Sequence, residues 1–194
     1  FWGIPYYRRF YGIEAAEIGS LMGLFMAIGG FIGVMLGGVL ADRLRLHNQK
    51  AKLNICLCGW FLALLAALSM LLVENVHLAY ACSFVFFLTV PLGQAPIIST
   101  INDLMIPRTR AVGTAMNILI PTFMGVALGP YVVGLLSDTF VASGVDGGEA
   151  LRQGLLSGLA PQVIAIIFLL FAIKHIVNDE NSRLDRARAL GEEI

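Results

Sequence analysis

The chain has 194 residues, of which 58% are hydrophobic and 13% are charged, and its formal net charge is zero. A soluble chain carries charge on about a quarter of its residues, so this composition indicates an all-α integral membrane protein whose surroundings are a lipid bilayer. A net charge of zero gives no sign of a nucleic-acid partner. The three scattered cysteines fit neither a disulfide framework nor a metal site, and no cofactor or catalytic motif is present, so we expect no enzyme.

Five stretches are long and apolar enough to cross the bilayer core, which takes about 20 helical residues. Residues 1–12 are too short to cross and rich in aromatic rings, as at a membrane interface. We expect them to be the outer end of a helix whose beginning is missing, and the chain, which starts at Phe1, to be a fragment of a longer protein. The predicted spans are residues 13–40, 53–73, 78–104, 111–136 and 154–177, and residues 178–194 are a predicted cytoplasmic tail.

The first span is rich in glycine, with Gly19 and Gly23, and again Gly29 and Gly33, four residues apart. Glycines at this spacing let a second helix approach closely, because apolar side chains gain nothing over lipid. The pattern predicts helix packing or, alternatively, a face that slides against a neighbouring helix.

A basic loop follows this span and begins with Asp42 and Arg43, with Arg45 two residues further on. A carboxylate at the membrane edge pairs with a base or with the N-terminal end of an adjacent helix, which is worth about 0.3 to 1 kcal/mol. These three residues therefore predict either a conformational latch or an ordinary charged helix end.

The third span is interrupted by Pro91 and Pro96 and also carries Gln94 and Ser99. Each proline frees a carbonyl that protein or cavity water must satisfy, so this span either lines a cavity or is a kinked, packed helix. The fourth span carries one amide, Asn117, which serves a structural hydrogen bond or contacts a substrate. Helix bending and interface contacts are expected at Pro91, Pro96, Gly125, Gly129, Pro130 and Gly134.

The basic residues give the orientation. With the loop after Asp42 inside, ten lysines and arginines lie on the inner side and three, Arg8, Arg9 and Arg152, on the outer side. This bias follows the positive-inside rule and predicts a cytoplasmic C-terminus, which we expect at a bacterial inner (plasma) membrane. Arg8 and Arg9 depart from the rule locally. No span has a carboxylate, lysine, arginine or histidine near its middle, so a coupling residue is expected outside this sequence.

Two segments resemble motifs of the major facilitator superfamily of secondary transporters. Gly38-Val39-Leu40-Ala41-Asp42-Arg43 is similar to the loop signature found after the second and eighth helices, although the signature's later glycine is absent. Gly125, Gly129-Pro130 and Gly134 resemble the Gly-Pro motif of the fifth and eleventh helices, with Val133 where a glycine is expected. The segments at Pro107-Arg108 and Ser137-Asp138 look most like the spinster-like branch.

The resemblance implies the C-terminal six-helix half of a twelve-helix carrier, from the end of helix seven to helix twelve, rocking against an N-terminal half. It implies alternating access for a small organic solute, either an organic anion or a lipid-like amphiphile, by symport or antiport with a coupling ion such as H+. Asp42, Arg43 and Arg45 would be the latch. The candidate substrate-cavity residues are Tyr6, Tyr7, Gln94, Ser99 and Asn117. A non-transporting scaffold or receptor and a channel are the alternatives.

Overall fold

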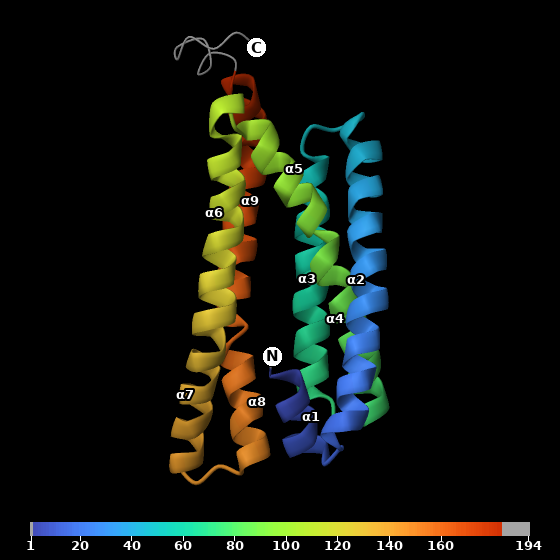
Figure 1. Ribbon diagram of the computed structural model, residues 1–194, viewed down its shortest axis with the longest axis vertical. Coiled ribbons are helices and arrows are strands. Elements are labelled where there is room, and N and C mark those ends of the chain that lie inside the picture. Colours follow the sequence, from blue (N-terminus) through green and yellow to red (C-terminus); the bar gives the residue numbers. More distant parts are fainter. Residues whose placement is uncertain (1, 184–194) are drawn as a thin grey trace.

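The computed structural model of the protein describes residues 2–183 (Figure 1). Every regular element in this range is helical, which confirms the all-α class. The predicted tail is therefore described only as far as Arg183, and its remaining residues, Arg186 and Arg188 among them, lie outside the described range. The elements are α1 (Gly3–Tyr11), α2 (Ala15–Arg45), α3 (Ala51–Leu72), α4 (Val76–Leu92), α5 (Gln94–Leu104), η1 (Pro107–Thr109), α6 (Arg110–Pro121), the π-helix η2 (Thr122–Leu128), α7 (Gly129–Ala142), α8 (Gly147–Ser157) and α9 (Ala160–Asn181).

Within residues 2–183, five helices are long and apolar enough to cross a membrane when segments joined at a kink are taken together. The last of them begins at Gly147, before the predicted start at residue 154. The Asp146 side chain accepts the backbone N–H of Gly148, so this polar segment starts a helix instead of forming a loop. The five are Ala15–Arg45, Ala51–Leu72, Val76–Leu104, Arg110–Ala142 and Gly147–Asn181.

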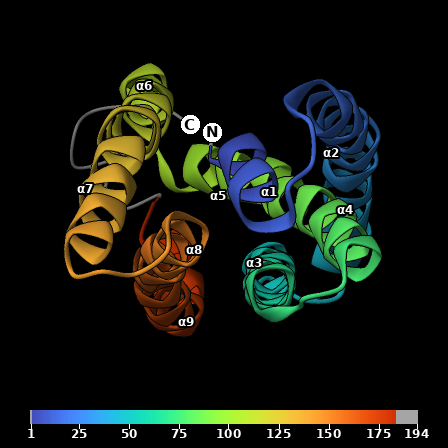
Figure 2. The same cartoon turned by 90° about the horizontal axis from the view of Figure 1, so that it is seen from below.

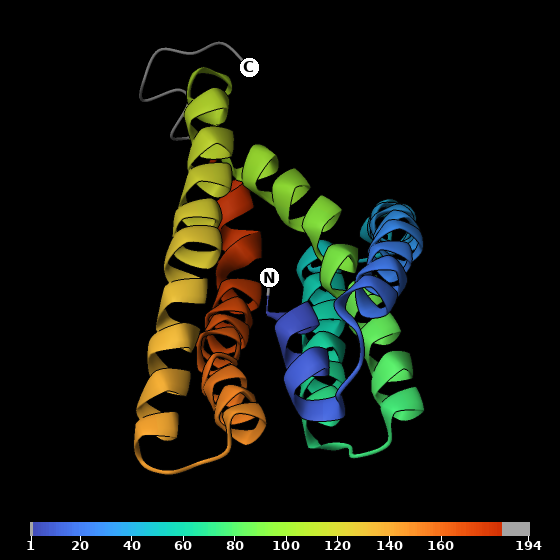
Figure 3. The same cartoon turned by 60° about the horizontal axis from the view of Figure 1, so that its bottom comes forward.

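The helices form two groups. Figure 1 shows α6, η2 and α7 as one column beside α8 and α9, with α2, α3 and α4 packed together as the other group. Seen along the bundle, α1 lies between the groups (Figure 2). At the end of the bundle where α9 ends, α5 leaves α4 obliquely and bridges to the first column (Figure 3). Two apolar cores join the groups, one around Tyr6 and Tyr7 of α1 and the other around Cys56 of α3 and Leu169 of α9.

Direct backbone contact joins α2 to α4. Gly29, Gly33 and Gly37 are buried on one face of α2. A Cβ added to Gly33 would lie 2.2 Å from the Leu88 carbonyl oxygen, and one added to Gly37 would lie 2.0 Å from that of Leu92. The packing interpretation of Gly29 and Gly33 is thus confirmed and extends to Gly37, whereas Gly23 faces open space. The alternative of a sliding face stays a prediction.

One of these glycines, Gly37, also contacts a backbone carbonyl that lacks its usual helical hydrogen-bond donor because a proline follows four residues later. Pro96 has no N–H to give to the Leu92 carbonyl, and that oxygen points at Gly37. Because it lies 2.0 Å from the position of the absent Cβ, it is nearly in line with a Cα hydrogen of Gly37. Such Cα–H···O contacts are worth about 0.5 to 1 kcal/mol each. The α2 glycines therefore compensate in part for the break in the third span.

The break itself falls at Gly93, between α4 and α5. On its α3 side it is packed, because a Cβ on Gly93 would lie 2.6 Å from Trp60 Nε1, and the Cys56 thiol donates to the Gly93 carbonyl at 3.2 Å. The two prolines of this span therefore produce a kink that is held against α3.

The fourth span also departs from a regular helix. Pro121 cannot donate to the Asn117 carbonyl, and the chain passes from α6 into the wider turns of η2 before α7 begins at Gly129. No residue of η2 is buried in this structure. The irregular segment lies where the sequence predicted bending.

Candidate functional site

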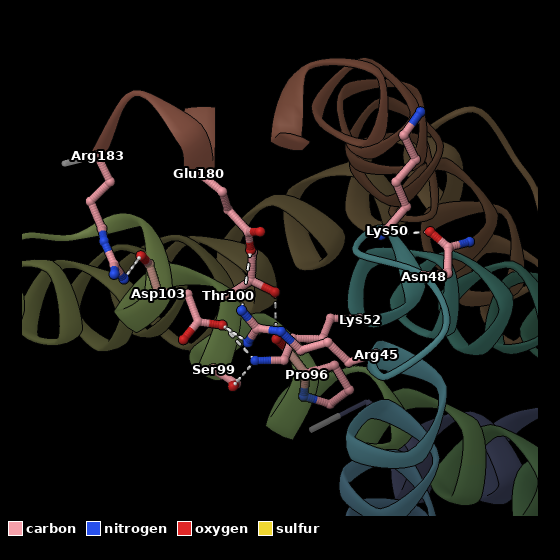
Figure 4. A network of polar contacts seen from close by, with 10 residues as sticks. All are labelled: Arg45, Asn48, Lys50, Lys52, Pro96, Ser99, Thr100, Asp103, Glu180 and Arg183. Atoms are coloured by element: carbon pink, nitrogen blue, oxygen red, sulfur yellow. Dashed lines mark hydrogen bonds and ion pairs between the residues drawn. The ribbon is translucent and has the colours of Figure 1, made fainter. Parts of the chain in front are cut away.

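Five charged side chains meet at the end of the bundle where α9 ends (Figure 4). Asp103 of α5 is at the centre. Its Oδ2 accepts from Lys52 Nζ of α3 at 2.5 Å and from Arg45 Nη1 of α2. Arg45 Nη2 also lies 3.7 Å from Glu180 Oε1 of α9. Arg183 completes the group by donating to the Asp103 backbone carbonyl at 2.8 Å. We call these five residues the Asp103 cluster; it ties α2, α3 and α5 to the end of α9.

Lys52 is the most enclosed member of the cluster. Its side chain is 6% exposed, whereas those of Asp103 and Arg45 are 27% and 37% exposed. The ammonium also donates to Ser99 Oγ at 2.5 Å. Burying a charge is costly unless it is paired and hydrogen-bonded, so Asp103 and Ser99 offset the cost of burying the Lys52 ammonium. The more exposed Arg45 pair contributes less, because solvent screens it.

Two members of the Asp103 cluster are placed unfavourably with respect to the dipoles of their own helices. Lys52 lies in the first turn of α3, where the helix dipole disfavours a cation, and Asp103 lies in the last turn of α5, where it disfavours an anion. Pairing the two offsets both costs. Residues placed against local preference and then paired across helices indicate a role in fixing how the helices are arranged.

Among the predicted latch residues, only Arg45 enters the Asp103 cluster. Asp42 and Arg43 are exposed and make no hydrogen bond or ion pair within residues 2–183. Their latch role needs a partner beyond the described residues and stays a prediction.

The five predicted cavity residues do not come together. Tyr6 and Tyr7 are fully buried at the opposite end of the bundle, where the Tyr7 hydroxyl lies 2.8 Å from Ser83 Oγ and Tyr6 donates to the Leu71 carbonyl at 3.4 Å. Ser99 belongs to the surroundings of Lys52. For all three, the observed partners are structural, and their contact with a substrate stays a prediction.

Gln94 and Asn117 have amides that no described residue engages. Gln94 is exposed at the start of α5, directly after the break. Asn117 of α6 is half-buried and lines a groove of about 490 Å³ between α5 and α6. The other walls of this groove are mainly apolar, with Ile101 and Met105 from α5 and Met116 and Ile120 from α6. A groove with one amide on an apolar wall suits an apolar solute that carries a hydrogen-bonding group.

The predicted bending and interface residues lie at the irregular segments. Pro91 and Pro96 flank the break at Gly93, and Gly125 is in η2. Gly129 and Pro130 begin α7, where the Pro130 carbonyl accepts from Trp2 Nε1 at 3.3 Å. The Trp2 ring also packs on Gly134, whose added Cβ would lie 3.4 Å from it. The Gly-Pro segment thus provides a flat surface for α1.

No motif or spacing in the sequence groups Lys52, Asp103, Glu180 and Arg183. The available signal was complementary charge at the same end of four spans, since Arg45, Lys52, Asp103 and Glu180 all lie at the predicted inner ends.

The sequence matches no protein-family profile. It is 30% identical over 154 residues to an MFS-type efflux pump of Mycolicibacterium smegmatis, an alignment that covers 75% of this chain and 33% of the pump. It is 29% identical over 133 residues to mouse protein spinster homolog 3, with 65% and 25% coverage. The chain thus spans about a third or less of the length of these relatives.

The fold is similar to that of a bacterial homolog of the human lysosomal transporter Spinster in an inward-facing, unoccupied conformation. The TM-score is 0.63 at 19% identity, over 93% of this chain and 43% of that one. The occupied, inward-facing structure gives a TM-score of 0.60 at 18% identity, over 95% and 45%. The helices of this chain therefore have the arrangement of a part of that fold.

Proposed function

Given that the chain belongs to the major facilitator superfamily and is related to its spinster-like branch, we propose that it forms the C-terminal six-helix half of a secondary active transporter. In this proposal α1 is the end of helix seven, and α2, α3, α4–α5, α6–α7 and α8–α9 are helices eight to twelve. The other half is supplied by an N-terminal segment, and the two halves rock about a central site to give alternating access.

The Asp103 cluster is the observation that carries this proposal. Rocking requires each half to move as one body, so that its helices keep their mutual positions while the interface with the other half changes. The cluster fastens four helices at one end, and the core around Tyr6 and Tyr7 fastens α1 to the bundle at the other. We infer that the half is built to move as a unit, with the cluster end and the C-terminus on the cytoplasmic side of a plasma membrane.

The proposed transporter carries a small organic solute, either an organic anion or a lipid-like amphiphile. The apolar groove beside Asn117 supports a solute with an apolar part. A coupling ion such as H+ would act on a residue outside this segment, since the charged residues of the described spans lie near the helix ends.

The test of the function is counterflow of a labelled solute into proteoliposomes that contain the full-length protein and unlabelled solute. A carrier exchanges label transiently above equilibrium, whereas a scaffold or receptor gives no exchange. A channel gives equilibration without overshoot and a flux far above carrier turnover. Either of those two results would overturn the proposal.

Replacing Gln94 or Asn117 by alanine is expected to raise the KM for transport by about two- to tenfold, because each loses one hydrogen bond worth about 0.5 to 1.5 kcal/mol. Initial transport rates against solute concentration measure this. Asn178→Ala, which removes an exposed amide near the end of α9, is the matched control and should leave KM unchanged. An unchanged KM in both variants would remove Gln94 and Asn117 from the site.

Asp42→Asn is expected to shift the balance of inward- and outward-facing states by about two- to fivefold, the equivalent of about 0.4 to 1 kcal/mol for a charge at a helix end. Accessibility labelling of single cysteines from either side measures the balance. Asp138→Asn makes the same charge change on an exposed residue of α7 and is the control. Identical labelling of the Asp42 variant and the parent would count against the latch.

A further inference from the structure

The two faces of α1 have different surroundings. One face carries Tyr6, Tyr7, Phe10 and Tyr11, which stack on one another and on Tyr80 of α4. The opposite face carries Ile4, Pro5, Arg8 and Arg9, in the same pattern of paired positions four residues apart. Residues at this spacing share one side of a helix, so both arginines are directed away from the aromatic core.

The aromatic face holds α1 firmly in place. The Tyr11 hydroxyl donates to the Val73 carbonyl at 2.5 Å, and that of Tyr6 donates to the Leu71 carbonyl at 3.4 Å. Both carbonyls belong to the end of α3, where backbone acceptors lack helical donors. Because α1 is fixed in this way, Arg8 and Arg9 project from a rigid support, which lowers the entropic cost of using them to bind a ligand.

A hollow of about 520 Å³ lies against this arginine face. It is lined by Ile4, Pro5, Arg8 and Arg9 of α1 and by Ala15 in the first turn of α2. Neither arginine makes an ion pair or hydrogen bond through its side chain within residues 2–183. Two exposed carboxylates are nearby in sequence, Glu14 directly before α2 and Glu17 in its first turn, yet neither pairs with these arginines. The hollow therefore contains two cationic groups whose donors remain available.

The sidedness of these arginines is unusual. They lie at the end of the bundle opposite the Asp103 cluster, the outer end in the proposed orientation, where basic residues are disfavoured. An anion bound to the two guanidinium groups would offset their like charge on that side, because each group then makes charge-assisted hydrogen bonds.

We propose that Arg8, Arg9 and the hollow beside them form a binding site for an anionic group, a phosphate or carboxylate attached to an apolar stem. The guanidinium groups hold the anion, while Ile4, Pro5 and Ala15 contact the stem. The placement of the site at the outer mouth of the carrier rests on the proposed function. The binding itself rests on the hollow and its two arginines. A free organic anion and the headgroup of an anionic lipid share this chemistry.

The test is calorimetric titration of inorganic phosphate, at low ionic strength, into the full-length protein in phosphatidylcholine nanodiscs. Phosphate is expected to bind, and Arg8→Gln with Arg9→Gln to weaken it by about tenfold or more, as expected for losing charge-assisted hydrogen bonds. Arg108→Gln with Arg110→Gln, an exposed pair at the other end of the bundle, is the matched control and should not change phosphate affinity. Glu17→Gln should strengthen binding by removing a nearby negative charge.

A second arm repeats the titration in nanodiscs that contain phosphatidylglycerol. If phosphate binding is lost there but present in phosphatidylcholine, the anionic lipid occupies the site, and if binding persists, the ligand is a free anion. Absence of phosphate binding in both lipids, or equal affinity in the parent and the double variant, would overturn the proposal. Should the double variant fail to fold, the single variants Arg8→Gln and Arg9→Gln give the same comparison. Phosphate reaches both faces of the protein in a nanodisc, so the titration measures binding whether or not transport occurs. Loss of counterflow with phosphate binding intact would therefore contradict only the transport function.

Discussion

Gly37→Ala is expected to lower the free energy of unfolding by about 3 kcal/mol or more. The new methyl group would lie 2.0 Å from the Leu92 carbonyl oxygen and 2.9 Å from the Leu92 carbonyl carbon. These are backbone atoms, which no rotamer change moves aside, so α2 and α4 must separate along their shared face. Separation also removes the Cα–H···O contact to the carbonyl that Pro96 deprives of its helical donor. Equilibrium unfolding in mixed micelles, followed by circular dichroism, measures the change.

Gly30→Ala is the matched control for this prediction. Gly30 belongs to the same helix but has open space at the position of its Cβ. Alanine there should stabilise the helix by about 0.5 to 1 kcal/mol, because the unfolded chain loses freedom and helix propensity rises. The two substitutions are chemically identical and differ only in the face of α2 that they change. Equal stability of the Gly30 and Gly37 variants would mean that α2 does not contact α4 through its glycines.

The same glycines show how far the sequence carries the prediction. Spacing alone selected Gly19 with Gly23 as readily as Gly29 with Gly33, since both pairs offer a flat face. Only the second pair is packed against α4, because that part of α2 faces the helix kinked by Pro91 and Pro96. The local sequence pattern thus predicted close helix packing through glycine and a bend in the third span. Tertiary contact decided which of the two glycine pairs packs against another helix.

The charged residues show the opposite case. Apolar runs and the positive-inside rule predicted helical spans and an inner end, and Arg45, Lys52 and Asp103 all lie near that end. Lys52 and Asp103 are 51 positions apart, and no periodicity connects residues on different helices. Likewise, the aromatic residues of 1–12 indicated an interface, but the burial of Tyr6 and Tyr7 depends on the end of α3 and the first half of α4 lying beside them. Pairings of this kind depend on how the helices assemble.

Asp103→Asn is expected to destabilise the bundle by about 3 kcal/mol, since removing one partner of a buried pair leaves an uncompensated charge. The charge left behind is that of Lys52, whose side chain is 6% exposed and whose remaining partner, Ser99, is neutral. Glu149→Gln breaks the more exposed pair with Arg152 in α8 and is the control, with an expected cost of about 0 to 1 kcal/mol. The same unfolding measurement in mixed micelles compares the two.

Adding Lys52→Met to Asp103→Asn should restore most of the lost stability, to within about 1 kcal/mol of the parent, because an apolar side chain of similar length needs no counter-charge. Recovery of stability identifies the unpaired ammonium as the cause of the single-variant defect. If the cluster also makes the half move as one body, the restored double variant should remain folded and yet transport more slowly in counterflow. The buried Lys52–Asp103 pair would no longer join α3 to α5, and Arg45 of α2 would have lost the Asp103 carboxylate. A double variant as unstable as Asp103→Asn would show that Lys52 is not the group that Asp103 stabilises.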